Sequence, residues 1–332
     1  MRNGKRFKLI GAGISALLVL ASCSSSLPEP EPERAPAAPA PVLTQEQLAQ
    51  LLDEVEVQLT EGDISMNPED LGERVAGSAR EIRTAEYLIE SADPARPITP
   101  LPREDLMVIV PATNEWPRDI VVVTEPPADS QIPRVLVLQQ ETPRDNFALT
   151  LWSQLLPGVS MPAMPLPEEG AQPLAADAEG FVVTPGEVGE AFIDVLQGKK
   201  ADEEDSRVEL FGEDPLSKAI QDQYEALKDG VSAVGEVKKT FEPAEEPVAA
   251  FEALQGGAIV ITSVREVTTF KINSGSLNVS SETATLLDKE SVTSELKTTH
   301  ELSLVFYIPP ADSDEEITVL GETRDPISAS GK

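Results

Sequence analysis

The side chain best suited to acid–base chemistry in this sequence is its single histidine, His300. An imidazole exchanges protons near neutral pH, so a Ser-His-Asp triad would have to use this residue. Because alternate side chains of a strand share a face, His300 is expected to point the same way as Leu302 and Leu304. We therefore predict a packed or edge histidine on an apolar face, with a pocket-lining or catalytic role as the alternative.

Two short clusters of acidic side chains occur at residues 202–205 and 312–316. Neither cluster has the glycine and ligand spacing of an EF-hand loop, so we predict solvated loops. One histidine and one cysteine are too few for an ordinary zinc site, and no G-x-x-x-x-G-K-[ST] phosphate loop is present. The sequence therefore predicts no metal site and no cofactor. Carboxylate pairs for glycoside hydrolysis cannot be selected among 58 acidic residues.

The two tryptophans are weaker candidates for a binding site. Trp152 lies in a predicted strand and is expected in the core. Trp116 precedes Pro117, so it either rims a pocket or anchors a loop.

The N-terminus has the pattern of a secretory signal. Four basic side chains within residues 2–8 precede an uncharged run over residues 9–21, which is shorter than the roughly 20 residues of a membrane-crossing helix. The run ends in Leu20, Ala21, Ser22 and Cys23, which resembles the lipobox of bacterial lipoproteins. The resemblance implies a signal peptide over residues 1–22, cleavage before Cys23, and acyl chains such as palmitate on that cysteine.

This N-terminal resemblance predicts a protein held on the extracytoplasmic face of the cell membrane. Cys23 is the only cysteine, so no intramolecular disulfide can form, and a single retained thiol at this position suits lipidation. The alternative is an ordinary signal peptide or an N-terminal anchor with an incidental cysteine.

The overall charge excludes one class of partner. The formal net charge is −32, and removing the four basic residues of the signal peptide brings it to −36. Phosphate backbones repel such a surface, so nucleic-acid binding is not expected. Anionic lipids are repelled as well, which leaves the acyl anchor to hold the membrane.

Composition separates a tether from a folded body. Six of the eighteen residues 24–41 are proline, a composition that favours extended polyproline II over a packed core. We predict a lipidated cysteine and disordered stalk over residues 23–42, and then two α+β domains, over 43–182 and 183–332.

Each predicted domain has helices followed by strands. In the first, Thr44 and Gln47 form a capping-box pattern before leucines at helical spacing, and Asn67-Pro68 predicts a second helix start. Residues 80–90 are ambiguous between helix and strand. Strands are expected at 106–110, 120–124, 135–140 and 147–155, with a hairpin turn over 142–146 and a loop over 157–175.

The same order returns in the second half. Thr184 and Glu187 form another capping-box pattern, and Asp214-Pro215 predicts another helix start. Strands are expected at 237–241, 258–272, 296–308 and 317–322. The repetition is compatible with a duplication or with a single α+β domain whose N-terminal half is irregular.

Helix pairs followed by long antiparallel strands resemble the cone-shaped NTF2-like fold, here in one or two copies. The C-terminal runs at 256–260, 305–310 and 327–330 are similar to secreted actinobacterial lipoproteins without an assigned function. The resemblance implies an α+β fold of helix pairs on curved antiparallel sheets, but no reaction.

Two functions remain open at this stage. The absence of catalytic motifs favours a non-catalytic cell-envelope lipoprotein that binds a partner protein or an apolar ligand. The alternative is a hydrolase or isomerase acting through carboxylates in an NTF2-like cavity. A carboxyl group with a raised pKa inside a closed pocket would favour the enzyme.

Overall fold

The computed structural model describes residues 39–128, 130–244 and 249–332. The predicted signal peptide, Cys23 and residues 23–38 of the predicted stalk lie outside this part of the chain. Pro41 and Val42, at the end of the predicted stalk, contact the body: Pro41 forms a β-bridge with Ala112, and the Val42 amide donates to the carbonyl of Pro111 at 3.0 Å.

Helix α1 (Gln45–Ser65) begins where the capping-box pattern predicts. The Thr44 hydroxyl accepts from the Gln47 amide, and the Gln47 side chain accepts from the Thr44 amide at 2.9 Å. This exchange satisfies two backbone donors that a helix start leaves without partners. The predicted apolar face is buried, at Leu48, Leu51, Leu52, Val55 and Leu59.

The second predicted helix start gives only one turn. Asn67 caps the 3-10 turn η1 (Pro68–Leu71), accepting from the Glu69 amide at 3.2 Å. The turn ends at Gly72, whose φ of +54° does not continue a right-handed helix. The next helix, α2 (Gly77–Ala92), covers the stretch that the sequence left ambiguous.

All four strands predicted in the first half are confirmed. They are β1 (Asp105–Ile109), β2 (Arg118–Thr124), β3 (Arg134–Gln140) and β4 (Ala148–Gln154), and they form an antiparallel sheet in the order β1-β2-β3-β4. The turn between β3 and β4 is closed by the Asp145 amide, which donates to the Thr142 carbonyl at 3.1 Å. The predicted hairpin is therefore present.

The helices of the second half are α3 (Val188–Leu196) and α4 (Pro215–Val231), with the 3-10 turn η2 (Val208–Leu210) between them. Asp214 caps α4 as predicted, accepting from the Leu216 and Ser217 amides at 3.3 and 2.7 Å. The capping box predicted at Thr184 is not formed. Its hydroxyl contacts the Glu187 carboxylate at 2.7 Å, and Glu187 itself is the N-cap of α3.

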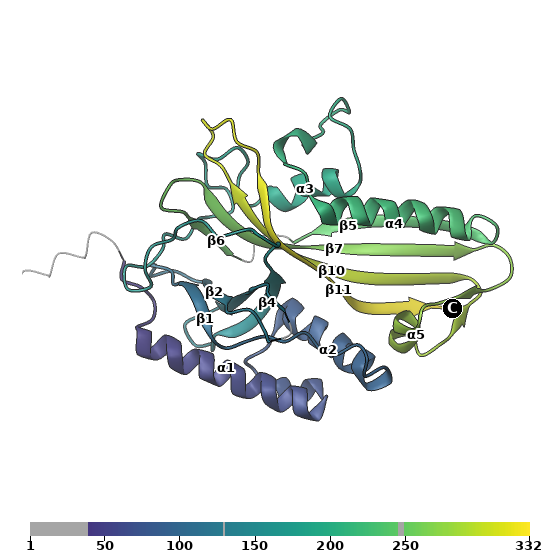
Figure 1. Cartoon of the computed structure of the whole chain (residues 1–332), viewed down its shortest axis with the longest axis horizontal. Coiled ribbons are helices and arrows are strands. Elements are labelled where there is room, and N and C mark those ends of the chain that lie inside the picture. Colours follow the sequence, from purple (N-terminus) through teal and green to yellow (C-terminus); the bar gives the residue numbers. More distant parts are fainter. Residues whose placement is uncertain (1–38, 129, 245–248) are drawn as a thin grey trace, which may run out of the picture. The chain divides into compact units, whose positions relative to one another are not determined.

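The second sheet is larger and carries the long strands of the molecule (Figure 1). Its order is β11-β10-β7-β5, with β6 also paired to β7, and every pairing is antiparallel. Strand β7 matches its prediction, whereas β11 runs nine residues past the predicted end at 322. The bounds are β5 (Gly235–Pro243), β6 (Ala249–Glu252), β7 (Ala258–Ile272), β10 (Glu295–Ile308) and β11 (Thr318–Gly331).

Between β7 and β10 the chain makes an excursion that the sequence did not reveal. It contains β8 (Leu277–Asn278), the short helix α5 (Ser281–Leu287) and β9 (Ser291–Val292). In Figure 1, α5 lies beside the end of β11, and α4 runs along the strands over β5 and β7.

The two sheets share one hydrophobic core. Its side chains come from both, including Val121, Val137 and Leu151 of the first sheet and Ile261 and Val305 of the second. Residues Ala38–Lys332 form one compact unit. The fold is α+β with antiparallel sheets, as predicted, whereas its resemblance to NTF2-like domains and the division at residues 182 and 183 stay predictions.

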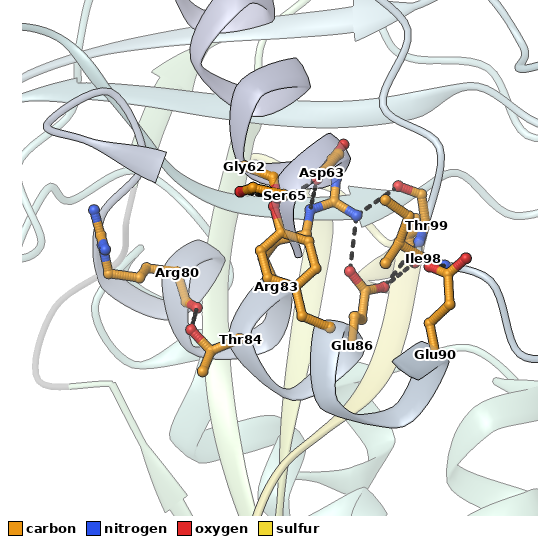
Figure 2. A network of polar contacts seen from close by, with 11 residues as sticks. Gly62, Asp63, Ser65, Arg80, Arg83, Thr84, Glu86, Glu90, Ile98 and Thr99 are labelled. Carbon is orange, nitrogen blue, oxygen red and sulfur yellow. Dashed lines mark hydrogen bonds and ion pairs between the residues drawn. The ribbon is translucent and has the colours of Figure 1, made fainter. Parts of the chain in front are cut away.

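A buried arginine joins α1, α2 and the loop after α2 (Figure 2). Arg83 Nη1 donates to Glu86 at 2.8 Å and to the carbonyl of Thr99 at 2.9 Å, and Nε lies 3.5 Å from Asp63. The guanidinium stacks 5.0 Å from the ring of Trp152, which is fully buried as predicted. These contacts compensate for burying the charge, so we assign Arg83 a structural role.

Candidate functional site: a charged cluster beneath helix α4

Four ionisable side chains lie on the face of the larger sheet that α4 and α5 border. Glu266 on β7 is paired across the sheet with His300 on β10. Arg324 on β11 is opposite Leu302, and Lys239 on β5 is opposite Thr268. Because alternate residues of a strand share a face, these pairings bring all four to one side of the sheet.

Glu266 is the centre of the cluster. Its carboxylate is fully buried and accepts two hydrogen bonds from Arg324, from Nε and Nη2, each at 2.7 Å. Lys239 Nζ lies 2.8 Å from the same carboxylate, and the Thr268 hydroxyl lies 3.3 Å away. Two cations therefore surround one carboxylate, and the cluster carries one excess positive charge.

The pKa shifts agree with a cluster of two positive charges and one negative charge. Burial alone would raise the pKa of Glu266, but the hydrogen bonds and charge of Arg324, together with Lys239, hold it at about 2. Burial lowers the pKa of Lys239, and Glu266 opposes that change. Burial and then the charge of Arg324 lower the pKa of His300 to about 4, so its imidazole is neutral at pH 7.

A cavity of about 340 Å³ opens over the cluster, and we call it the α4–α5 cavity. His300 and Arg324 contribute its charged and imidazole groups from the sheet. Apolar side chains come from α4, β7, the segment before α5 and β10, and a few polar groups lie among them. The lining residues are Gln223, Leu227, Val231, Thr268, Phe270, Leu277, Asn278, Val279, Ser280, Glu282, Thr283, Leu296, Thr298, His300 and Arg324.

His300 is the sequence-predicted candidate that this site contains. It shares its face with Leu302 and Leu304, which are fully buried, and it also lines the cavity. Its Nδ1 atom is buried and has no hydrogen-bond partner within the part of the chain that the structure describes. An unpaired buried polar atom is costly, so the position of this nitrogen is an unfavourable feature of the cluster.

The structure does not bring Trp116 to the cavity. Trp116 lies in the loop before β2 with 36% of its surface exposed. Its indole N–H donates to Gln140 at 3.2 Å, and the Arg118 guanidinium stacks 3.7 Å from the ring centre. The loop-anchoring alternative therefore fits Trp116 better than a pocket rim.

Sequence reasoning missed Lys239, Glu266 and Arg324. The one local signal was Glu266, a charge on the buried side of the β-branched run 258–272. Its partners could not be identified, because Arg324 lies 58 positions away and the sequence offers 26 lysines and arginines to choose from.

A second cavity, of about 360 Å³, lies beside the middle of α4. Lys239 and Tyr224 contribute to its lining, together with Gln221 and Phe241. Lys239 does not line the α4–α5 cavity, so the charge of the cluster and the lining of that cavity can be changed separately.

Among the residues that the structure describes, three carboxyl groups have raised pKa values, and none of the three lines either cavity. Burial raises the pKa of Glu322 to about 9, assisted by a hydrogen bond with Asp214. Burial also raises the pKa of Asp325 to about 7, with a contribution from Glu86, and that of Asp119 to about 7. The Glu322–Asp214 contact lies at the start of α4, where Asp214 is the N-cap.

The two acidic clusters noted in the sequence lie on the surface, with every Asp and Glu exposed. Over residues 39–128, 130–244 and 249–332, no group of three or more His, Cys, Asp and Glu side chains is arranged to hold a metal ion. Among the helices in the same ranges, none combines the length and apolar character needed to cross a bilayer.

Comparison with known protein families gives a match over the body of the chain. A family model described as "Domain of unknown function (DUF8094)" matches residues 39–331, which is nearly the whole body. No curated protein and no solved structure matches the chain. Since the match spans well over half of the sequence, the chain belongs to the DUF8094 family.

Proposed function

We propose that this protein is a non-catalytic, lipid-anchored binding protein of the cell envelope, whose body takes up a small apolar ligand in the α4–α5 cavity. The carrying observation is the cavity itself. Its volume of about 340 Å³ is at the lower end of the range for small-molecule sites. Apolar walls with a few convergent polar groups are the usual lining of such sites.

The walls give this cavity its preference for apolar surface. Leu227 of α4, Phe270 of β7 and Leu296 of β10 contribute to it from three different elements. Phe270 and Leu296 also belong to the small core beneath α4, so the packed sheet holds them in place. A ligand that removes such surface from water gains about 25 cal/mol per Å².

The rival function, a carboxylate-dependent hydrolase or isomerase, needs a carboxyl group with a raised pKa in the cavity. Glu322, Asp325 and Asp119 have raised pKa values but lie elsewhere. The carboxylate beneath the cavity, Glu266, has its pKa lowered by Arg324 and Lys239. These observations favour binding over catalysis.

The membrane part of the proposal is supported by the N-terminal sequence. The basic segment, the short apolar run and the Leu20-Ala21-Ser22-Cys23 box together support export, cleavage and acylation of Cys23. Two acyl chains are sufficient for stable anchoring. The body would then sit on the extracytoplasmic face of the cell membrane, and its partner would be a small ligand or an envelope protein.

The neutral fluorescent probe N-phenyl-1-naphthylamine tests the binding site. The mature chain (residues 23–332) carrying Cys23→Ala is used, so that no acyl chain competes for the probe. We expect saturable binding of one probe per chain. Thr298→Phe places a ring in the cavity, because Thr298 is one of its lining residues, and should weaken binding by about tenfold or more.

Thr299→Phe is the matched control. It makes the same change at the next position of β10, on the opposite face of the sheet. It should bind the probe like the parent chain, provided that thermal unfolding shows both variants to be folded. Equal loss in the two variants, or no saturable binding by the parent chain, would overturn the proposed function.

A further inference from the structure

We infer that the ligand of the α4–α5 cavity is an amphiphile with a single negative charge, whose anionic group is held by Arg324 beside His300. This inference rests on the proposed function and adds the chemical class of the ligand. Two observations support it: the excess positive charge beneath the cavity, and the Nη1 atom of Arg324, which the cluster does not use.

The positive charges beneath the cavity outnumber the negative charges. Arg324 and Lys239 each carry a positive charge, whereas Glu266 supplies only one negative charge. His300 adds none at neutral pH, because burial and Arg324 keep its pKa low. Excess charge in a buried setting is unfavourable unless a counter-charge is present. A ligand with one anionic group supplies that counter-charge, and a second anionic group would have no partner.

Arg324 has the free donors that such a group needs. Its Nε and Nη2 atoms bind Glu266, and Nη1 makes no hydrogen bond to any of the described residues. The side chain retains 20% of its exposure and lines the cavity. Hydrogen bonds between a guanidinium and an anion are among the stronger ones in proteins. The neighbouring imidazole of His300 also lines the cavity and adds a polar side chain beside Arg324.

The other charged side chain of the lining does not reverse this preference. Glu282 of α5 also lines the cavity, but it forms an ion pair with Arg96. The chain as a whole is strongly acidic, so its field does not attract anions from a distance. Recognition of the anionic group must therefore be local, and buried charge contacts of this kind are screened little by salt.

A matched pair of fluorescent probes tests the inference. 1-Anilinonaphthalene-8-sulfonate has the same ring system as N-phenyl-1-naphthylamine and adds one sulfonate. The readout is the ratio of the two dissociation constants on the mature chain carrying Cys23→Ala. We expect the sulfonate probe to bind about tenfold tighter or more, since a hydrogen bond to a charged group contributes at least that factor.

Three variants test whether the charge of the cluster sets the ratio of the two dissociation constants. Lys239→Met removes one positive charge without touching the cavity lining, and it should move the ratio back toward one. Glu266→Gln removes the negative charge, and it should move the ratio further in favour of the sulfonate. Lys218→Met is the control, since Lys218 is exposed on α4 and pairs with Asp222, and it should leave the ratio unchanged.

The possible outcomes are distinct. Binding of the neutral probe with no advantage for the sulfonate contradicts the inference but leaves the proposed function standing. An advantage that survives Lys239→Met and does not grow in Glu266→Gln also contradicts it. Failure of both probes to bind overturns the proposed function and this inference together.

Discussion

Glu266 is the residue that organises the charged cluster beneath the α4–α5 cavity. A fully buried carboxylate is costly, and it persists here because Arg324 contacts it twice and Lys239 once. Sequence reasoning could place His300 on its apolar face, since strand parity is a local property. It could not assemble the cluster, because the pairing of β5, β7, β10 and β11 decides which distant side chains meet.

At the residue scale, His300 should make the protein less stable in acid. Its pKa is about 4 in the folded protein, against about 6.5 for a free imidazole, so the unfolded chain binds the proton first as pH falls. Stability is therefore fully present above about pH 6.5 and is lost as pH falls toward 4. The expected loss from this residue is about 2 kcal/mol between about pH 7.5 and pH 5.

Chemical denaturation of the parent chain and of His300→Gln at several pH values measures this effect. The variant should gain stability relative to the parent chain across that window, because glutamine does not titrate and all other titrating groups, including Glu322, Asp325 and Asp119, are the same in both chains. Below about pH 4.5 the lowered pKa of Glu266 should reduce the stability of both chains. Parallel curves for the two chains down to about pH 5 would show that His300 is not buried in its neutral form.

Cys23 is the other residue with a specific predicted chemistry. Cys23→Ala should abolish lipidation, because the sequence contains no other thiol to accept a diacylglyceryl group. Metabolic labelling of cells with an alkynyl fatty acid tests this, followed by detection of the protein on a gel. Equal labelling of the parent and the variant would remove the basis for the lipoprotein assignment.

At the element scale, prediction succeeded where a structure depends on neighbouring residues. The cap of α1 at Thr44 and the cap of α4 at Asp214 are local, and both were predicted correctly. Prediction failed where contacts with distant residues or reversals of the chain determine the secondary structure. The start at Asn67 gives one turn because Gly72 reverses φ, and β6 was missed because its four residues are a strand only through pairing with β7.

Two helical glycines provide a matched test of helix packing. Gly62 lies inside α1, where an added Cβ would come within 2.6 Å of Leu71 and 2.7 Å of the Tyr87 hydroxyl. Gly230 lies in the last turn of α4, where nothing lies within 4 Å of the same position. Both residues have helical surroundings, so they differ mainly in the space around them.

Gly62→Ala should destabilise the protein by about 1–3 kcal/mol, the usual cost of overpacking. Gly230→Ala should stabilise it by up to about 1 kcal/mol, because alanine is the better helix former. Urea denaturation measures both changes. If Gly62→Ala also increased stability, the contact between α1, Leu71 and Tyr87 would be looser than the structure shows.

At the scale of the whole molecule, the shared core should make the body unfold as one unit. Val137 of the first sheet and Ile261 of the second belong to the same buried cluster. We expect calorimetry to show a single transition. Val137→Ala and Ile261→Ala should each lower its midpoint, with a loss in stability of about 2–5 kcal/mol for the isoleucine and less for the smaller valine.

Two separate transitions, each shifted by only one of these substitutions, would instead support independent domains over residues 43–182 and 183–332. The sequence predicted those domains from the repeated order of helices and strands. That order says nothing about which faces pack together, and the structure places strands of both halves around one core.

At the scale of the whole molecule, the location of the binding site is tested most directly by a crystal structure. The crystals contain the mature chain carrying Cys23→Ala, grown with 1-anilinonaphthalene-8-sulfonate. We predict one probe between α4, α5 and the larger sheet, with its rings against Leu227, Phe270 and Leu296 and its sulfonate within hydrogen-bond distance of Arg324 Nη1. A probe seated instead in the groove between α1 and β1, which Leu48 and Leu106 line, would contradict the assignment of the α4–α5 cavity as the binding site.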